Sequence, residues 1–289
     1  MIIAEREGLL TSAAELASSL GDRRLRVIDC RFDLMAPQAG REAYREAHIP
    51  GAVYADLDQD LSGPVGTDSG RHPLPSVEAA EATFSRLGID ADTGVICYDA
   101  AGGAIASRAW WLLRWLGHRR VTVLDGGLQA WQAQGLPFEC GAQEVTRREF
   151  RGFENPERVL TTGEVAADFE AAAGSLLIDA RDTARFRGEV EPIDTRAGHI
   201  PGSRNLPFTA CLSEDGTWQD GDSLRHLLER VLGDDERAPW AVMCGSGVTA
   251  CHLAISGLLA GYSEPRVYIG SWSEWIRDAS RPVRLGAAV

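Results

Sequence analysis

Residues Trp240–His252 read WAVMCGSGVTACH, and this stretch decides what kind of fold the chain can adopt. The apolar run 240–243 is typical of a buried strand, and Cys244 follows it directly. Two glycines then permit a tight turn. Apolar residues at helical spacing begin at Val248 and stop before Gly261, where a helix would end. The stretch therefore predicts a strand, a glycine-rich loop that starts with a cysteine, and a helix.

The position of Cys244 has a chemical consequence. Backbone N–H groups at a helix N-terminus, together with the helix dipole, favour a negative charge. Gly245 and Gly247 allow the backbone to curl so that several N–H groups face one sulfur. We therefore expect Cys244 to ionise more readily than a free thiol and to act as a nucleophile. The alternative is a buried structural cysteine beside a glycine turn.

Length and composition limit the possible functions. The 289 residues suffice for two domains, and 44% hydrophobic and 25% charged residues are typical of soluble globular proteins. A formal net charge of −13 argues against nucleic acid or an anionic membrane as the partner. No run approaches the roughly 20 apolar residues of a membrane span. The early charges are unlike a signal peptide, so we expect a cytoplasmic protein.

The six cysteines form no metal-binding or dithiol motif. None belongs to a CxxC pair, so the sequence indicates neither a zinc site nor a thioredoxin-type centre. The loop after Cys244 lacks the Lys-Ser/Thr of a phosphate-binding loop. We therefore expect no metal and no cofactor, and we expect the cysteines to be reduced thiols.

The two halves of the chain repeat the same landmarks in the same order. Each half has a capping box before a helix, a strand that ends in Asp-x-Arg, a His-Ile-Pro-Gly turn, and further buried strands with helices between them. Three matching pairs keep a nearly constant offset: His48 and His199, Asp99 and Cys244, Gly117 and Gly261. The offset is longer than any solenoid repeat, so it predicts a duplicated domain.

Within each half, short apolar strands alternate with helical stretches. This pattern favours an α/β fold with two tandem domains, each a parallel sheet with helices on both faces. We expect the first domain over residues 1–140, a linker over 141–158 and the second domain over 159–289. Ligands of such sheets bind at the carboxyl ends of the strands. There the second copy has Cys244, whereas the first has Asp99, which cannot be a sulfur nucleophile. The first domain is therefore predicted to be catalytically silent.

The chain resembles the two-domain rhodanese sulfurtransferases over nearly its whole length. The resemblance is carried by the duplication, the two His-Ile-Pro-Gly turns, Asp125-Gly126-Gly127, the stretch 270–275 and the loop Cys244–Thr249. Gly-Ser after the cysteine is similar to the 3-mercaptopyruvate sulfurtransferases, since thiosulfate-preferring enzymes more often carry Arg-Lys there. Ile269 departs from the pattern, because the family often has aspartate before Gly-Ser.

The resemblance implies a mechanism with two sulfur-transfer steps. The thiolate of Cys244 attacks the thiol sulfur of 3-mercaptopyruvate, pyruvate leaves, and the cysteine holds a persulfide. A thiophilic acceptor such as cyanide, a small thiol or reduced thioredoxin then takes the outer sulfur. The resemblance also implies a Ser–His–Asp relay of Ser246, His72 and Asp58, which would help to move the thiol proton. His72 and Asp58 lie in the first half, so we expect the site to form between the domains.

The resemblance further implies a binding site for the carboxylate of the donor. Arg185 matches an arginine that the family uses for this purpose, and a guanidinium can bind a carboxylate through two hydrogen bonds. Arg196 is a second candidate, although the spacing around it departs from the family pattern. The remaining substrate-binding candidates are backbone groups of the loop, namely those of Gly245, Gly247, Val248 and Thr249.

Neutral residues at positions 245 and 246 favour a donor with one carboxylate over thiosulfate, a compact dianion. Two other functions stay open: thiosulfate:cyanide sulfurtransferase, and a non-catalytic persulfide carrier that docks a partner. A cysteine phosphatase can share this fold but needs an arginine to close the loop, and residues 245–265 contain none. His48 in the first copy corresponds to His199 in the second copy, so we interpret both as turn-forming residues. The expected partners are a small-molecule sulfur donor and a thiol or thioredoxin-like acceptor.

Overall fold

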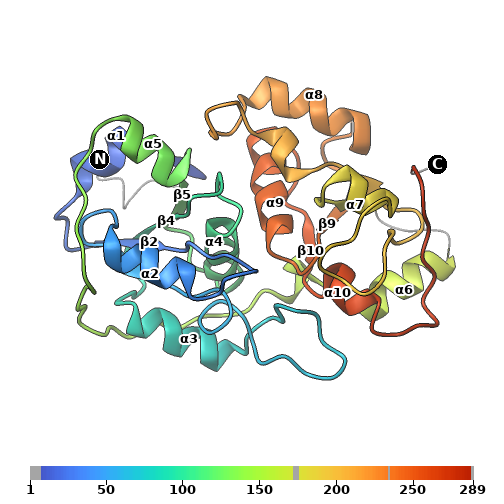
Figure 1. Cartoon of the computed structure of the whole chain (residues 1–289), viewed down its shortest axis with the longest axis horizontal. Coiled ribbons are helices and arrows are strands. Elements are labelled where there is room, and N and C mark those ends of the chain that lie inside the picture. The colour runs from blue at the N-terminus through green and yellow to red at the C-terminus, as the bar shows by residue number, and fades with distance from the viewer. Residues whose placement is uncertain (1–7, 172–175, 234, 288–289) are drawn as a thin grey trace. The chain divides into compact units, whose positions relative to one another are not determined.

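The computed structural model describes residues 8–171, 176–233 and 235–287, which fall into two compact units (Figure 1). Unit 1 consists of the described parts of Met1–Gly63, Pro75–Asn155 and Ser213–Trp218. Unit 2 consists of the described parts of Pro64–Leu74, Pro156–Leu212 and Gln219–Val289. Each unit therefore includes a short segment from the other half of the chain. We call Pro64–Leu74 the 64–74 segment.

Unit 1 is built on a parallel five-stranded sheet of its described residues, in the order β1-β5-β4-β2-β3. Its strands are β1 (Leu10–Thr11), β2 (Leu25–Asp29), β3 (Val53–Tyr54), β4 (Gly94–Tyr98) and β5 (Val121–Leu124). Its helices are α1 (Ala13–Ser19), α2 (Ala39–Glu46), α3 (Val77–Arg86), α4 (Ala106–Trp115) and α5 (Gly127–Ala133).

Unit 2 repeats this sheet strand for strand, in the order β6-β10-β9-β7-β8, again parallel throughout the described residues. Its strands are β6 (Val159–Leu160), β7 (Leu176–Asp179), β8 (Arg204–Asn205), β9 (Trp240–Met243) and β10 (Arg266–Tyr268). Its helices are α6 (Thr162–Ala171), α7 (Thr183–Arg187), α8 (Gly221–Leu232), α9 (Thr249–Leu259) and α10 (Ser271–Trp275), with 3-10 turns η2 (Pro156–Arg158) and η3 (Phe208–Cys211). The predicted duplication and the α/β class are confirmed.

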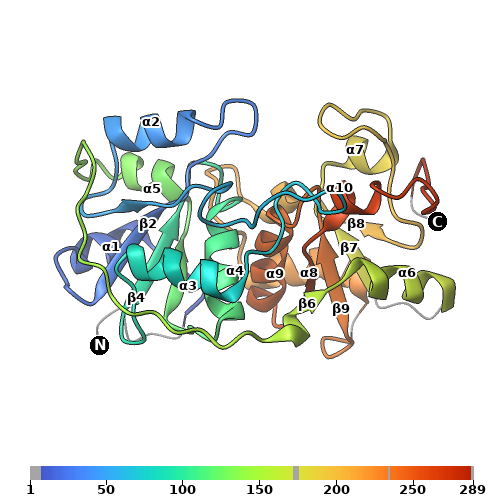
Figure 2. The ribbon, with the colours of Figure 1, turned by 90° about the horizontal axis from the view of Figure 1, so that it is seen from below.

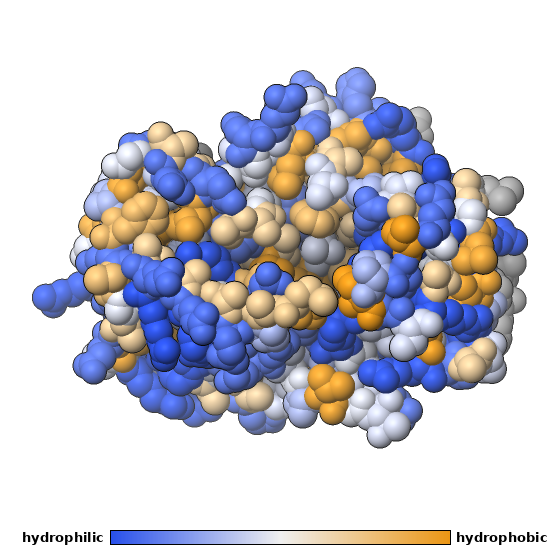
Figure 3. All heavy atoms as spheres, in the orientation of Figure 1, coloured by the Kyte–Doolittle hydropathy of each residue, from blue (hydrophilic) through white to orange (hydrophobic). Residues whose placement is uncertain are grey.

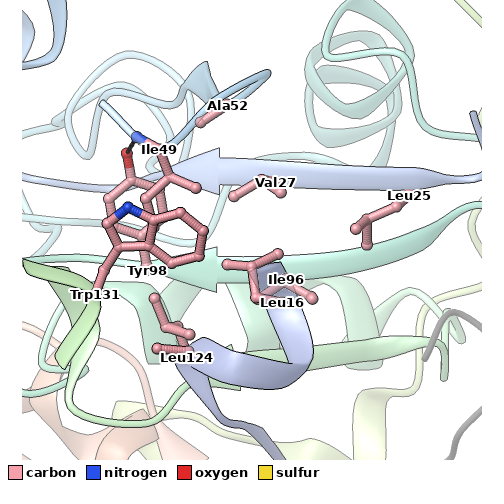
Figure 4. Packing of buried hydrophobic residues seen from close by; sticks show 10 residues of the cluster. Leu16, Leu25, Val27, Ile49, Ala52, Ile96, Tyr98, Leu124 and Trp131 are labelled. Atoms are coloured by element: carbon pink, nitrogen blue, oxygen red, sulfur yellow. Dashed lines mark hydrogen bonds between the residues drawn. The ribbon is translucent and has the colours of Figure 1, made fainter. Parts of the chain in front are cut away.

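The core of unit 1 lies between the sheet and the helices α1 and α5 (Figure 4). Successive side chains of a strand point to opposite faces of the sheet. Ile96 and Tyr98 of β4 therefore pack on the same side as Leu16 of α1 and Trp131 of α5. Burial of a side chain such as Leu16 stabilises the fold by about 1.5–3 kcal/mol. Helix α4 packs against β4 and β5 as well, so that helices flank the sheet.

The core of unit 2 has the same plan. Leu177, Met243 and Tyr268 from the sheet pack with Trp272 and Trp275 of α10, and both indoles are fully buried. Figure 2 shows α9 on one side of β9 and α6 on the other. The carboxyl end of β9, where Cys244 stands, is therefore held within layers of packed helices and strands.

Local sequence signals account for the starts of helices α1 and α6. Glu15 N–H donates to Ser12 Oγ at 3.3 Å and Ser12 N–H donates to a carboxylate oxygen of Glu15 at 2.9 Å. Thr161 and Glu164 make the same reciprocal pair at 3.3 and 2.8 Å before α6. Both predicted capping boxes are therefore confirmed.

Among the described residues, no helix is long and apolar enough to cross a bilayer. On the face shown in Figure 3, hydrophobic residues occur in small groups between hydrophilic ones. This distribution is normal for a protein surface.

Candidate active site

The loop Cys244–Val248 joins β9 to α9, as the sequence predicted, and its backbone is fixed to the start of α10. The amide of Cys244 donates to Ser271 Oγ at 3.0 Å, and its carbonyl accepts from Trp272 N–H at 3.0 Å. The carbonyl of Gly245 accepts from the amide of Ser273 at 2.8 Å. Two carbonyls at the start of the loop are thus directed to α10.

Gly247 is required by its surroundings. Its φ of +75° lies in the left-handed region that favours glycine, and a Cβ at this position would lie 2.4 Å from the carbonyl oxygen of Ile269. The loop therefore passes directly against the end of β10. The backbone of Ile269 lies so close to Gly247 that any side chain at position 247 would collide with it.

The matching loop of unit 1 shows what such a backbone can bind. Asp99 follows β4 as Cys244 follows β9, and its carbonyl accepts from Leu128 N–H at 2.8 Å. Its buried carboxylate accepts four backbone hydrogen bonds of 2.7–2.9 Å, from the amides of Ala101, Gly103, Ile105 and Ala106. In unit 1, the loop before the helix is an amide cradle filled by a carboxylate. Unit 2 has a sulfur at that position.

Ser246 contacts His72, the pair that the family resemblance implied. The Nδ1 atom of His72 lies 2.7 Å from Ser246 Oγ, and both residues are buried, at 3% and 7% exposure. His72 belongs to the 64–74 segment, so this contact is internal to unit 2. The segment is held by α10, because Gly70 N–H donates to Glu274 at 3.2 Å.

Asp58 belongs to unit 1, whereas His72 belongs to unit 2. Asp58 stands on an exposed turn, where its amide donates to Asp56 Oδ1 at 3.0 Å. Partial burial raises the pKa of Asp58, and the neighbouring charge of Asp56 raises it further. Within unit 2 the structure brings His72 and Ser246 together, and the role of Asp58 stays a prediction.

Two arginines lie beside the loop, one predicted and one not. A Cβ built on Gly245 would lie 3.7 and 3.8 Å from the terminal nitrogens of Arg185, which stands on α7. The same Cβ would lie 3.3 Å from Nη2 of Arg71, from the 64–74 segment. The side of the loop next to Cys244 therefore faces two guanidinium groups.

Two carboxylates hold these arginines. Asp194 pairs with both, at 2.7 Å to Arg71 Nη1 and 3.1 Å to Arg185 Nη2. Glu191 pairs with Arg185 at 2.7 Å. Burial raises the pKa of Glu191, but hydrogen bonds from Arg185 and from nearby amides outweigh that effect and lower this pKa. Glu191 is therefore held as a carboxylate.

A third arginine, Arg181, is buried near the nucleophile candidate. It pairs with Asp179 at 2.7 Å and lies 4.6 Å above the ring of Trp272. Burial lowers the pKa of Arg181, but the charges of Asp179, Glu191 and Cys244 outweigh it and raise this pKa. Arg31 and Asp29 form the same ion pair in unit 1. The repeated pair therefore has a structural role at the end of a strand in each unit.

Arg196 is hydrogen-bonded to Trp272 of α10 and to Arg281. Its Nη1 donates to the carbonyl of Arg281 at 3.2 Å, and its own carbonyl accepts from the indole of Trp272 at 2.8 Å. These contacts tie Arg196 to α10 and to the segment that follows it. It is the weaker of the two predicted carboxylate ligands.

The loop is well covered. Cys244 is 2% exposed and Val248 is 5% exposed, whereas Thr249 is partly exposed. A structural cysteine would be equally buried, so burial alone does not identify the nucleophile. The neighbours do distinguish the two cysteines of this region. Cys251 Sγ donates to the carbonyl of Gly247 at 3.4 Å, whereas Cys244 lies two residues before a serine that is hydrogen-bonded to histidine.

The remaining candidates behave as structural groups. His48 and His199 each place Nδ1 against a backbone carbonyl, at 2.7 Å to Tyr44 and 2.9 Å to Phe186, and each stacks on that same ring. Within the described ranges, no group of three or more His, Cys, Asp or Glu side chains could hold a metal ion.

Arg71 and Arg181 were not predicted from the sequence as site residues. Arg71 is adjacent to His72 in sequence, and that adjacency was the available signal. Arg181 belongs to the repeated Asp-x-Arg strand end, a pattern that indicated structure only. Neither position could be connected to Cys244 without knowledge of where the 64–74 segment and β7 lie.

Comparisons with known proteins agree with this geometry. Residues 12–134 and 161–278 both match the Rhodanese-like domain family. A "Probable 3-mercaptopyruvate sulfurtransferase" of Pseudomonas aeruginosa is 44% identical, over 96% of this chain and 98% of the relative. A "Putative thiosulfate sulfurtransferase SseB" of Mycobacterium tuberculosis is 39% identical, over 98% and 99%. The structure of 3-mercaptopyruvate sulfurtransferase from Leishmania major aligns with a TM-score of 0.82 at 31% identity, over 94% of this chain and 75% of that one.

Proposed function

The chain belongs to the rhodanese family of sulfurtransferases, and on that premise we propose that it moves sulfur from 3-mercaptopyruvate to a thiophilic acceptor through a persulfide on Cys244. The observation that carries the proposal is the 2.7 Å contact between His72 Nδ1 and Ser246 Oγ, two residues along from Cys244. A proton acceptor beside the nucleophile suits a donor that carries a thiol proton.

The first step transfers sulfur to the enzyme. The thiolate of Cys244 attacks the thiol sulfur of the donor, an S–S bond forms, and the C–S bond breaks. The electron pair of that bond leaves with the carbon fragment, which takes up a proton and is released as pyruvate. Ser246 and His72 accept the thiol proton, and Asp58 is proposed to support the histidine.

The second step regenerates the enzyme. The acceptor attacks the outer sulfur of the persulfide, the S–S bond breaks, and the thiolate of Cys244 returns. Both the thiolate and the persulfide are anions. The backbone amides of Gly245, Gly247, Val248 and Thr249 are proposed to stabilise them, as the amides of unit 1 hold a carboxylate.

The donor carboxylate is proposed to bind Arg185, the predicted arginine that lies beside Gly245. Arg196 stays a secondary candidate, because its guanidinium donates to a backbone carbonyl. Thiosulfate is the second candidate donor. The observation in its favour is the presence of two guanidinium groups next to Gly245, since cations there could hold a sulfonate. A non-catalytic persulfide carrier is the third possibility.

The first copy, residues 1–140, is proposed to be catalytically silent, with residues 141–158 as linker and 159–289 as the catalytic domain. Support comes from Asp99, whose carboxylate fills the cradle at the position of Cys244. A thiol or thioredoxin-like protein is the proposed acceptor. The cytoplasm is the proposed compartment, because its reducing conditions suit the six free cysteines.

Intact mass spectrometry after exposure to each donor tests the proposal. 3-Mercaptopyruvate should add one sulfur atom to the protein and release pyruvate, and Cys244→Ser should show neither change. Cys251→Ser is the matched control and should keep both. A higher kcat/KM for thiosulfate than for 3-mercaptopyruvate would move the second candidate into first place. Persulfide formation without steady-state pyruvate release would favour the carrier.

A further inference from the structure

Arg71 contributes a second guanidinium group to the loop of Cys244. We propose that Arg71 binds the donor carboxylate together with Arg185 and thereby selects donors with a single carboxylate. The inference rests on the proposed function, because it assigns the group that recognises the acid end of 3-mercaptopyruvate. The two arginines proposed to bind the carboxylate are thus Arg71 and Arg185, and Arg196 is not one of them.

The first observation is convergence on one position. A Cβ on Gly245 would lie 3.3 Å from Arg71 Nη2 and 3.7 Å from Arg185 Nη1. The arginines come from the 64–74 segment and from α7, yet both reach the space that a side chain at 245 would fill. Because residue 245 is glycine, both guanidinium groups can lie close to the backbone next to Cys244.

The second observation is that both arginines are held at a fixed distance from each other. Asp194 has one oxygen on each, at 2.7 Å to Arg71 and 3.1 Å to Arg185, and its side chain is only 5% exposed. The carboxylate of Asp194 therefore orients both guanidinium groups, and each guanidinium keeps further N–H donors. The Nε atom of Arg71 is buried and has no hydrogen-bond partner among the described residues. Buried donors of this kind are normally satisfied, so a bound carboxylate is a fitting partner.

The third observation connects Arg71 to the loop through one residue. Ser273 Oγ accepts from the amide of Arg71 at 3.0 Å, and the amide of Ser273 donates to the carbonyl of Gly245 at 2.8 Å. The backbone of Arg71 is thus fixed relative to the loop. A side chain mounted this way is pre-organised for binding, because little freedom is lost when the ligand arrives.

The charges around the loop favour a monoanion. Three cations and three anions are joined by recorded ion pairs: Arg71, Arg181, Arg185, Asp179, Glu191 and Asp194. This network is neutral, so the arginines supply directed hydrogen bonds with little surplus positive charge. One carboxylate adds a single negative charge to a chain whose formal net charge is −13, whereas thiosulfate would add two.

The test compares two donors that differ only in the carboxylate: 3-mercaptopyruvate and mercaptoacetone. In Arg71→Gln, kcat/KM for 3-mercaptopyruvate should fall roughly 10- to 150-fold, mainly through KM, as expected for loss of a hydrogen bond to a charged group. The value for mercaptoacetone should not change. Arg71→Lys keeps the charge but lacks the planar fork, and it should show a smaller loss of the same kind.

Arg277→Gln is the matched control. Arg277 Nε donates to the carbonyl of Ser69 at 3.1 Å, so it also anchors the 64–74 segment, but from an exposed position. It should leave both donors unaffected. Equal losses on both donors in Arg71→Gln and Arg71→Lys would overturn the assignment, because they would mean that Arg71 only positions its neighbour His72. Absence of pyruvate release by the unaltered protein would overturn the proposed function as well.

Discussion

His72 Nδ1 and Ser246 Oγ lie 2.7 Å apart, although 174 positions separate the two residues in the sequence. They meet because the 64–74 segment belongs to unit 2 and is bonded to α10. The same segment brings Arg71 to Gly245. A short segment from the first half of the chain therefore places both a histidine and an arginine beside the loop of Cys244.

The contact between His72 and Ser246 predicts a donor-specific loss of activity. Ser246→Ala should lower kcat/KM for 3-mercaptopyruvate by about 10²- to 10⁴-fold, the usual contribution of positioned proton transfer. His72→Gln should lower it to a similar extent, because the two residues act as one unit. Steady-state pyruvate release measures both variants.

Thiosulfate provides the control for that prediction. It has no thiol proton to give up, so persulfide formation from thiosulfate should decrease much less in Ser246→Ala. Equal losses with both donors would mean that the hydroxyl supports the loop rather than moving a proton. Thermal midpoints of the variants separate either effect from unfolding, since His72 is buried.

Ser271 predicts a measurable backbone effect. It has a φ of +52°, unusual for a residue other than glycine, and its Oγ accepts from the amide of Cys244 and donates to the carbonyl of Tyr268. Gly127 has the same conformation in unit 1. Ser271→Ala should lower the free energy of unfolding by about 1–3 kcal/mol, because it leaves buried groups unpaired. Ser271→Gly should cost less, since glycine removes the strain. Urea denaturation of both variants checks the order, and a larger cost for glycine would contradict it.

The filled cradle of unit 1 predicts a stability effect without a catalytic one. Asp99→Asn replaces one acceptor oxygen by an N–H donor, so two of the four amides lose their partner. The free energy of unfolding should fall by at least about 1–3 kcal/mol. The kcat of the folded protein should stay unchanged if the first copy is silent. Asp92→Asn is the control, because that side chain is 91% exposed. Lost activity in folded Asp99→Asn would argue that the first copy takes part in turnover.

Glu164 predicts a dependence of stability on pH. Hydrogen bonds from Thr161 and Arg266 lower the pKa of Glu164 to about 2, from an ordinary value of 4.5. The stabilisation is therefore complete above about pH 4.5 and is lost as the pH falls toward 2. Thermal midpoints of the wild type and Glu164→Gln should differ at neutral pH and converge in acid.

Salt provides a second check on Glu164. Its side chain is 44% exposed, so the charge interaction with Arg266 is screened and the difference should be small. It should shrink further in concentrated salt. If the thermal midpoints of the wild type and Glu164→Gln still differed by the same amount at low pH, the stabilisation would come from the capping geometry and not from the charge of Glu164.

Much of the fold could be predicted from local patterns. The strands at 240–243 and 121–124 lie where apolar runs end at turn residues, and the structure has the same bounds. The helix expected to stop before Gly261 ends at Leu259, and Gly261 has a φ of +87°. These features depend on neighbours in sequence, and the repeat of one pattern made the second copy predictable from the first.

The candidate site was predictable only in part. Cys244, Ser246 and the loop follow from one contiguous stretch, and His72 came from a resemblance of motifs. Arg71 could not be found, because a lone arginine in an irregular segment has no periodicity that relates it to a strand end. His72 lies in a segment that the structure assigns to unit 2, and no local pattern in the sequence indicates that assignment.

The sequence by itself determined the α/β class, the duplication and the cysteine at a strand end, because periodicity, capping and glycine turns are short-range properties of the chain. Only the tertiary structure decided which distant groups surround that cysteine. The 64–74 segment is held by hydrogen bonds to α10, and the arginines are held by Asp194. Those partners are separated by many residues, and nothing in the local sequence specifies the path that brings them together.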